Sequence, residues 1–185
     1  MYTNGSSAIW QMTHLYYKNM KENSKKFIQQ MTHPLKSRMF LFLKLPAAFF
    51  SGVRIKSISD ERCEITVPFK WFSQNPFRST YFACLAMAGE MSTGILCLMQ
   101  IFERNPSVSM LVVNLEANYL KKAVDVTTFT CEDGKAIELL IDEIISTGES
   151  KSFKAKSVGR NEAGEIVAEF FITWSFKAKK KQLIS

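Results

Sequence analysis

The chain has 185 residues, 46% hydrophobic and 22% charged, which is typical of a globular protein with one core, and no apolar run is long enough to predict a transmembrane span. The formal net charge is +7, but the excess lysines gather near the two ends, and no recognition helix, zinc spacing or aromatic-basic motif accompanies them. We therefore expect no nucleic-acid partner, and a cytoplasmic location, because the N-terminus does not resemble a secretory signal.

Residues 1–33 are polar and basic with scattered aromatic residues, and they predict an N-terminal extension that is partly helical or mobile. From Pro34, apolar residues recur at helical spacing until Pro46 and Gly52 break the pattern, which predicts a short helix. Residues 53–69 then alternate apolar and polar side chains around a Ser-Asp-Glu turn. This pattern predicts a first β-hairpin.

Residues 80–102 lack proline and are rich in Ala, Leu and Met, which predicts a buried helix of about six turns. Small residues from Ala83 to Cys97 recur three or four positions apart, so a sheet could approach that side of the helix closely. Glu90 lies beside this stripe and is the only charged residue in the segment.

A carboxylate in so apolar a helix is costly when ionised. Desolvation should raise the pKa of Glu90 toward neutral pH, where it could act as a base. The alternative reading is structural: Glu90 could cap a backbone group, pair with Arg78 or a lysine, or point to solvent.

Beyond Asn105 and Pro106, four segments rich in β-branched and aromatic residues predict strands. They are residues 109–120, 126–133, 151–160 and 165–177. The turn with Asn161 and Gly164 predicts a hairpin between the last two strands. Residues 135–150 fit either a helix or a strand, and we favour a helix.

A short helix, a hairpin, one long buried helix and several antiparallel strands predict an α+β protein with the hotdog fold. In this fold a curved antiparallel sheet wraps around a long central helix. We expect residues 34–178 to form one domain, with residues 1–33 as an extension and residues 179–185 as a basic tail.

Residues 75–90, NPFRSTYFACLAMAGE, resemble the hotdog-fold acyl-CoA thioesterases of the phenylacetate-degradation type, and within them an uncharacterised DUF4442-like branch. The resemblance covers about residues 34–178. In that family an Asn precedes the helix carboxylate by fifteen residues, as Asn75 precedes Glu90 here. Many members carry His-Gly-Gly where this chain has Tyr81-Phe82-Ala83. The backbone N–H of Ala83 remains available, but the methyl group of Ala83 narrows the path by which a thioester oxygen would reach this N–H.

The resemblance implies hydrolysis of an acyl or aryl thioester by a homodimer or a dimer of dimers, with coenzyme A as part of the substrate and with no metal or separate cofactor. It implies Glu90 as base or nucleophile, the Ala83 amide as a donor to the thioester oxygen, and Asn75 holding the thioester or the attacking water. Each site would lie between a helix terminus of one chain and the carboxylate of the other. Substrate contacts are expected from Tyr81, Phe82, Arg78, Ser107, Ser109, Lys121 and Lys122.

Purely structural roles for the same residues stay open. Asn75 precedes a proline and could only form a turn, Tyr81 could be a packing aromatic, and Lys121 and Lys122 could lie in an exposed turn. The main rival function is a non-catalytic hotdog module that binds acyl-CoA, a fatty acid or a similar amphiphile. A third is an interaction protein whose basic ends bind nucleic acid or an anionic membrane, and it predicts lost binding when residues 1–33 and 178–185 are deleted.

The two histidines, His14 and His33, both precede the predicted core. This disfavours a Ser-His-Asp or Cys-His nucleophile, a histidine-rich zinc site and the hotdog hydratases that use an Asp-His pair. The chain has no Gly-rich phosphate loop. The cysteines are expected to be reduced core residues, because they are widely spaced within apolar patterns; they are Cys63, Cys84, Cys97 and Cys131.

Overall fold

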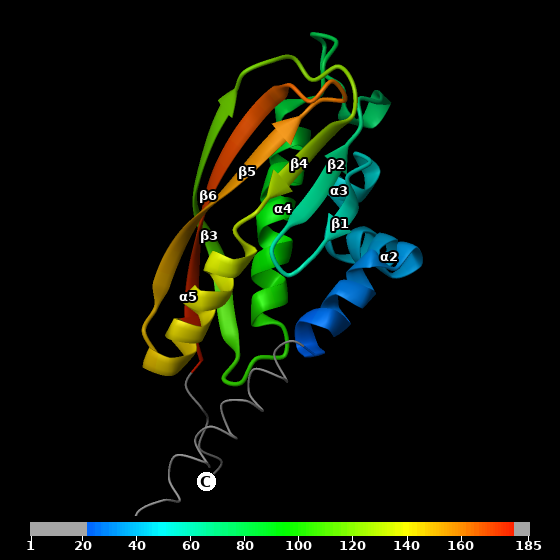
Figure 1. Ribbon diagram of the computed structural model, residues 1–185. Helices are drawn as coiled ribbons and strands as arrows, with labels where there is room; N and C mark the ends of the chain where they lie inside the picture. The colour runs from blue at the N-terminus through cyan, green and yellow to red at the C-terminus, as the bar shows by residue number, and fades with distance from the viewer. Residues whose placement is uncertain (1–21, 180–185) are drawn as a thin grey trace, which may run out of the picture.

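The computed structural model describes residues 22–179, which Figure 1 shows in colour. Residues 22–32 are helical. The elements that follow are α2 (Pro34–Lys44), α3 (Pro46–Phe50), β1 (Arg54–Ile58), β2 (Cys63–Val67), the 3₁₀ helix η1 (Trp71–Ser73), α4 (Phe82–Ile101), β3 (Val108–Tyr119), β4 (Thr127–Cys131), α5 (Gly134–Thr147), β5 (Lys151–Arg160) and β6 (Ile166–Ala178).

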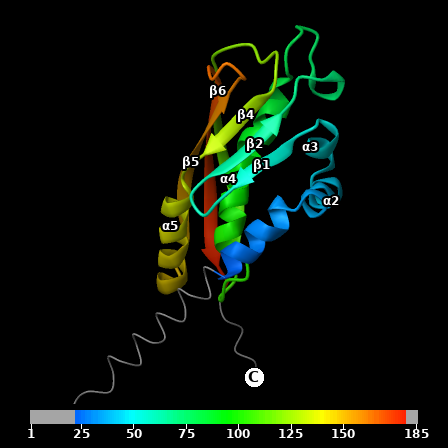
Figure 2. The same cartoon turned by 45° about the vertical axis from the view of Figure 1, so that its right-hand side comes forward.

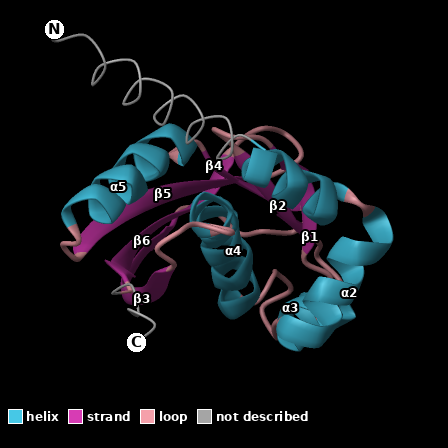
Figure 3. Cartoon of the chain, turned by 90° about the horizontal axis from the view of Figure 1, so that it is seen from below, coloured by secondary structure: helices cyan, strands magenta, loops and turns pink. Residues whose placement is uncertain are grey.

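The six strands found in residues 22–179 form one antiparallel sheet in the order β1-β2-β4-β5-β6-β3. The sheet curves around α4, which lies along its concave face, as Figure 3 shows from below. Helix α5 packs against α4 and against β5 and β6. A curved antiparallel sheet around a long central helix is the hotdog fold, so the predicted architecture is confirmed.

The helices and strands predicted between residues 34 and 178 are all present, including the ambiguous segment, which is helix α5. Its buried side chains Ile137, Ile141 and Ile144 recur at helical spacing, and the helix ends at Gly148 in the left-handed conformation. The four cysteines are buried, which confirms their prediction as core residues, and no two of them are joined by a disulfide.

Small residues of α4 let the sheet approach the helix closely. A Cβ at Gly89 would lie only 2.7 Å from Cδ2 of Phe170, which is in β6. One turn further along α4, Trp174 Nε1 donates a hydrogen bond to Thr93 Oγ1 at 3.0 Å. The predicted stripe therefore contacts the sheet at its middle, whereas Ala83 is only half-buried.

Part of the predicted N-terminal extension packs on the body of the protein. Within the helical residues 22–32, Phe27 is buried and its ring lies 5.3 Å from that of Phe102, just beyond α4. Lys26 also pairs with Glu103 at 2.7 Å. The rest of the predicted extension, residues 1–21, and residues 180–185 of the predicted tail lie outside the described residues.

By length and hydropathy, α4 is the one helix of the described residues that could cross a membrane, but most of it is buried within the protein. The core helix of a folded domain meets the same criteria, so its apolar sequence is explained by the sheet that surrounds it.

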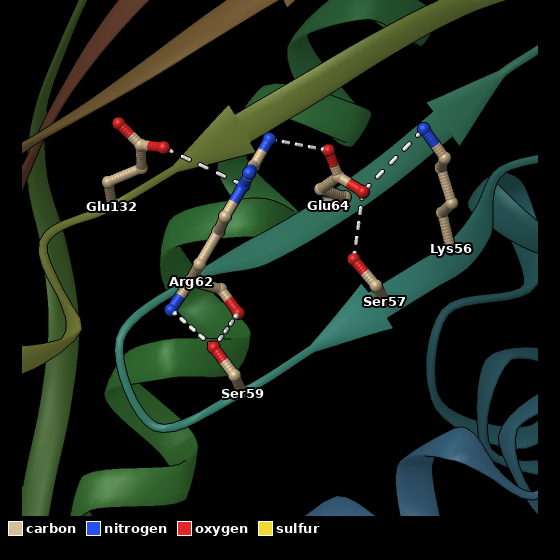
Figure 4. A network of polar contacts seen from close by, with 6 residues as sticks. All are labelled: Lys56, Ser57, Ser59, Arg62, Glu64 and Glu132. Atoms are coloured by element: carbon tan, nitrogen blue, oxygen red, sulfur yellow. Dashed lines mark hydrogen bonds and ion pairs between the residues drawn. The ribbon is translucent and has the colours of Figure 1, made fainter.

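The convex face of the sheet is charged. Glu64 alternates with the buried Cys63 and Ile65, so its side chain points away from α4. Figure 4 shows that it accepts a hydrogen bond from Ser57 at 2.8 Å and pairs with Arg62 at 2.7 Å. An apolar site would therefore lie on the concave side, near α4.

Candidate active site

A pocket of about 600 Å³ opens beside the N-terminus of α4. It is lined by residues 75–77 and 79–82 of the loop and helix start, by Leu85 one turn into α4, and by the distant residues 119–123. Five predicted site residues are brought together here, namely Asn75, Tyr81, Phe82, Lys121 and Lys122. The fold therefore joins the predicted helix start to the predicted lysine pair.

An aromatic wall forms much of this pocket. The rings of Tyr81 and Phe82 lie 4.8 Å apart, and that of Phe82 lies 6.3 Å from Tyr119 at the end of β3. Desolvation raises the pKa of Tyr119. Sequence reasoning missed Tyr119 and Leu120 as pocket residues, although their place directly before the lysine pair was a usable signal. Such a wall suits an apolar ligand with few polar groups.

The side chain of Asn75 makes its hydrogen bonds within its own loop. Its Oδ1 accepts hydrogen bonds from the backbone N–H of Phe77 at 2.9 Å and of Ser79 at 3.3 Å. Its Nδ2 donates to Ser79 Oγ at 3.1 Å and to the Thr80 carbonyl at 3.4 Å. These bonds shape the loop that leads into α4, so the turn-forming reading of Asn75 has direct structural support.

The first turn of α4 presents free backbone donors. The amides of Cys84 and Leu85 both bond to the Tyr81 carbonyl, but in the described part of the chain the amides of Phe82 and Ala83 have no acceptor. The N-cap residue, Tyr81, makes no side-chain capping bond to this helix end. Free N–H groups at a helix N-terminus attract negative charge, so these two amides could bind a developing oxyanion.

Glu90 lies two turns further along α4. Its side chain is partly buried, and desolvation raises its pKa above the ordinary value of 4.5. Among residues 22–179 its carboxylate has no hydrogen-bond or ion-pair partner. Within residues 22–179 of one chain, Glu90 therefore neither caps a backbone group nor pairs with Arg78 or a lysine, which were its structural alternatives. A desolvated, unpaired carboxylate is a candidate general base.

Glu90 and the free amides do not meet within one chain. Seven residues of α-helix separate Ala83 from Glu90, which is a rise of about 10 Å along the axis. Glu90 is also absent from the pocket lining. A thioester would have to span this distance to contact both groups of the same chain.

Three predicted substrate contacts, Arg78, Ser107 and Ser109, are not among the residues that line the pocket. Arg78 is exposed in the loop before α4, with a φ of 58°. Ser109 Oγ donates to the Lys177 carbonyl at 3.1 Å, and the Ser107 carbonyl accepts a bond from the Lys179 amide, so both serines sit at the start of β3. Ten residues of strand, about 33 Å, separate Ser109 from Tyr119 at the pocket.

The lysine pair lies at the mouth of the pocket. Lys121 pairs with Glu165 at 2.6 Å, and both side chains are half exposed. Lys122 is exposed and, within residues 22–179, has no ion-pair partner. Lys122 is therefore the freer of the two cations for a phosphate.

No group of three or more His, Cys, Asp or Glu side chains is placed to hold a metal ion within residues 22–179. His33 lies at the start of α2, where its Nδ1 accepts a bond from the Lys36 amide at 3.4 Å. His14 lies outside the described residues.

Residues 35–176 match the family model of the domain of unknown function DUF4442. A search of the curated proteins found no sequence match.

Several solved structures have a similar fold at low sequence identity. A Pseudomonas aeruginosa protein of unknown function, described as a probable thioesterase, superposes with a TM-score of 0.67 at 19% identity, over 81% of this chain and 99% of that one. A Chlorobaculum tepidum protein of unknown function gives 0.67 at 17% identity, over 84% and 94%. A Haemophilus influenzae thioesterase gives 0.57 at 14% identity, over 78% and 92%. At such identities the similarity shows the fold.

Proposed function

The chain belongs to the DUF4442 family, and from this premise we propose that it is a hotdog-fold thioesterase that hydrolyses an acyl or aryl coenzyme A thioester. The observation that carries the proposal is Glu90, a desolvated carboxylate without a partner among the described residues. Neighbours of the same fold, one described as a probable thioesterase and one as a thioesterase, support the reaction class.

In the proposed reaction, Glu90 accepts a proton from a water molecule that attacks the thioester carbonyl carbon. The free amides of Phe82 and Ala83 bind the negative charge that develops on the carbonyl oxygen. The carbon–sulfur bond then breaks, the proton held by Glu90 passes to the leaving sulfur, and the products are a carboxylic acid and the thiol of coenzyme A. Attack by Glu90 itself, through a covalent intermediate, uses the same two groups.

The two groups are contributed by different subunits in this proposal, because about 10 Å of helix separates them in one chain. The β3 edge supports a homodimer. Within residues 22–179, strand β3 ends the sheet and pairs with β6 alone, and Leu111, Val113 and Leu115 are exposed on it. A second copy that adds its own β3 would cover these residues and satisfy the free edge.

Such a pairing, if antiparallel and centred on the middle of β3, would bring the start of one β3 beside the end of the other. Ser109 of one copy would then approach Tyr119 and the pocket of the next copy. The predicted roles of Ser107 and Ser109 in substrate binding thus require the dimer. A further pairing of dimers is compatible with the same contact.

The remaining residues divide between the two ends of the substrate. Tyr81, Phe82 and Tyr119 contact the apolar part, and Lys122, with Lys121 and Arg78, meets the phosphates of coenzyme A. Direct contact of Asn75 with the thioester or the water stays a prediction. Its hydrogen bonds favour a positioning role, in which it holds the loop that leads into α4.

A non-catalytic binding module is the second candidate. It is favoured by Tyr81-Phe82-Ala83 at the helix start, because the Ala83 methyl group and the Phe82 ring restrict access to the free amides. In this version the same pocket binds an acyl-CoA, a fatty acid or a similar amphiphile without turning it over.

Turnover across a panel of short, medium, long and aromatic acyl-CoA thioesters distinguishes the two functions. Release of free thiol with any member of the panel supports the hydrolase. Saturable binding of a thioester without release of thiol, measured by calorimetry on the same preparation, supports the binding module instead.

A further inference from the structure

A continuous apolar surface covers α2, α3 and η1. The ring of Phe42 in α2 lies 6.3 Å from that of Phe50 in α3, which lies 6.2 Å from Phe72 in η1. Phe72 contacts the neighbouring Trp71 at 4.7 Å. All four side chains are exposed, from 50% for Phe42 to 75% for Trp71. Ring contacts therefore join three elements into one open surface.

The exposed face of α2 extends this surface. Met39 and Leu43 are exposed, and Met39 lies one turn before both Phe42 and Leu43 on the helix, whereas α2 is anchored by its one buried residue, Leu41. Figures 1 and 2 show α2 and α3 on the β1 side of the protein. We define the α2–η1 surface by six residues: Met39, Phe42, Leu43, Phe50, Trp71 and Phe72.

The segments that form the α2–η1 surface carry only positive charge. Residues 34–59 and residues 65–89 include Lys and Arg but no Asp or Glu. Lys36, Lys44 and Lys70 are exposed, and in the described part of the chain none of them forms an ion pair. Exposed aromatic rings are thus combined with unpaired cations.

Exposed aromatic rings together with unpaired lysines favour an anionic membrane as the partner. Adsorption to a membrane depends on buried apolar area together with attraction to anionic lipids, and Trp is favoured at the lipid–water interface. A second copy fits poorly, because a symmetric contact would bring the same unpaired lysines of both copies together without a carboxylate between them.

We propose that the α2–η1 surface docks this protein on an anionic lipid membrane, with the aromatic side chains in the headgroup layer and the lysines against lipid phosphates. The proposal is independent of the proposed function, because it uses neither Glu90 nor the pocket. It also differs from binding through the basic ends of the chain, because the surface lies within residues 34–89.

Vesicle flotation of the full chain tests this docking, with vesicles of phosphatidylcholine alone and of phosphatidylcholine mixed with phosphatidylserine. One variant combines Trp71→Ser with Phe72→Ser, and a second combines Lys36→Glu with Lys44→Glu. The matched controls are Leu139→Ser, an exposed apolar residue of α5, and Lys177→Glu, an exposed lysine of β6.

We expect partitioning onto the vesicles that contain phosphatidylserine, and a decrease of about tenfold or more in each double variant. Both controls should bind like the wild type. The proposal is overturned by absence of partitioning, by equal losses in the controls, or by binding that disappears only when residues 1–21 and 180–185 are deleted. It is also overturned if the wild type instead self-associates through this surface, seen as oligomers that Trp71→Ser with Phe72→Ser dissociates without vesicles.

Discussion

The carboxylate of Glu90 lies against Gly94, one turn further along α4. A Cβ at Gly94 would be 3.1 Å from Glu90 Oε1 and 3.2 Å from Cζ2 of Trp174. The Gly94→Ala variant should therefore displace the carboxylate and lower thioester turnover by about tenfold, since misplacement of a reacting group by a fraction of an ångström is costly. Stability should change by less than about 1 kcal/mol, because the helix preference for Ala offsets the crowding.

The matched control is Gly89→Ala in the same helix. Its Cβ would meet the buried ring of Phe170 at 2.7 Å, so overpacking should destabilise the fold by about 1–3 kcal/mol, measured by urea unfolding. Equal turnover in Gly94→Ala and the wild type would show that the position of Glu90 does not matter.

Glu90 should make stability depend on pH. Burial raises its pKa in the folded chain above the ordinary 4.5, so the folded state holds the proton more tightly than the unfolded state. Stability is thus lost as pH rises from about 4.5 through the folded pKa. Glu90→Gln removes this loss, so the variant should be more stable than the wild type at pH 8.

This stability difference should shrink as the pH falls to about 4.5, measured by denaturant unfolding at a series of pH values. The control is Glu162→Gln, in the exposed turn between β5 and β6. A Glu90→Gln variant that is less stable than the wild type at pH 8 would indicate a favourable partner for the carboxylate instead.

The methyl group of Ala83 should limit turnover. Ala83→Gly opens the approach to the free amides at the start of α4 and should raise kcat by a few fold, at a stability cost of up to about 1 kcal/mol. Ala86→Gly, one turn further along, has a similar helix cost and leaves the first turn unchanged. Equal kcat values in the two variants would show that the Ala83 methyl group does not limit turnover.

A mixed dimer tests whether each site is shared between two chains. Glu90→Gln removes the base, and Ala83→Leu blocks the amides with a larger side chain. Each homodimer should be nearly inactive. A heterodimer purified through two different tags has one site with both groups intact, so it should recover about half of the wild-type turnover. No recovery in a verified heterodimer would place both groups in one chain.

The fold could be predicted from the sequence because the burial of side chains follows the hydrophobic periodicity of each helix and strand. Cys63, Ile65 and Val67 alternate with half-buried residues in β2, and the apolar stripe of α5 identifies it as a helix. The period of the hydrophobic pattern shows which residues share a face of a helix or strand, but it does not show what covers that face. The apolar positions Met39 and Phe42 of α2 are accordingly exposed.

The candidate site could be predicted from the sequence only in part, for a related reason. Glu90 could be singled out because one charge in an apolar helix is unusual in any sequence. The contact of Tyr119 with Phe82 depends on the antiparallel pairing of β3 with β6, which no local pattern specifies. The bonds of Asn75 to its own loop likewise depend on the path of that loop.

The central claim is that Glu90 performs the chemistry of a thioesterase. Its most direct test compares kcat/KM of the wild type and of Glu90→Gln, with the best thioester of the panel and with matched circular dichroism spectra. The account predicts a decrease of about 100-fold or more in the variant, because loss of a general base or nucleophile costs at least that much. Turnover that is unchanged by Glu90→Gln would contradict the claim and assign the reaction to another group.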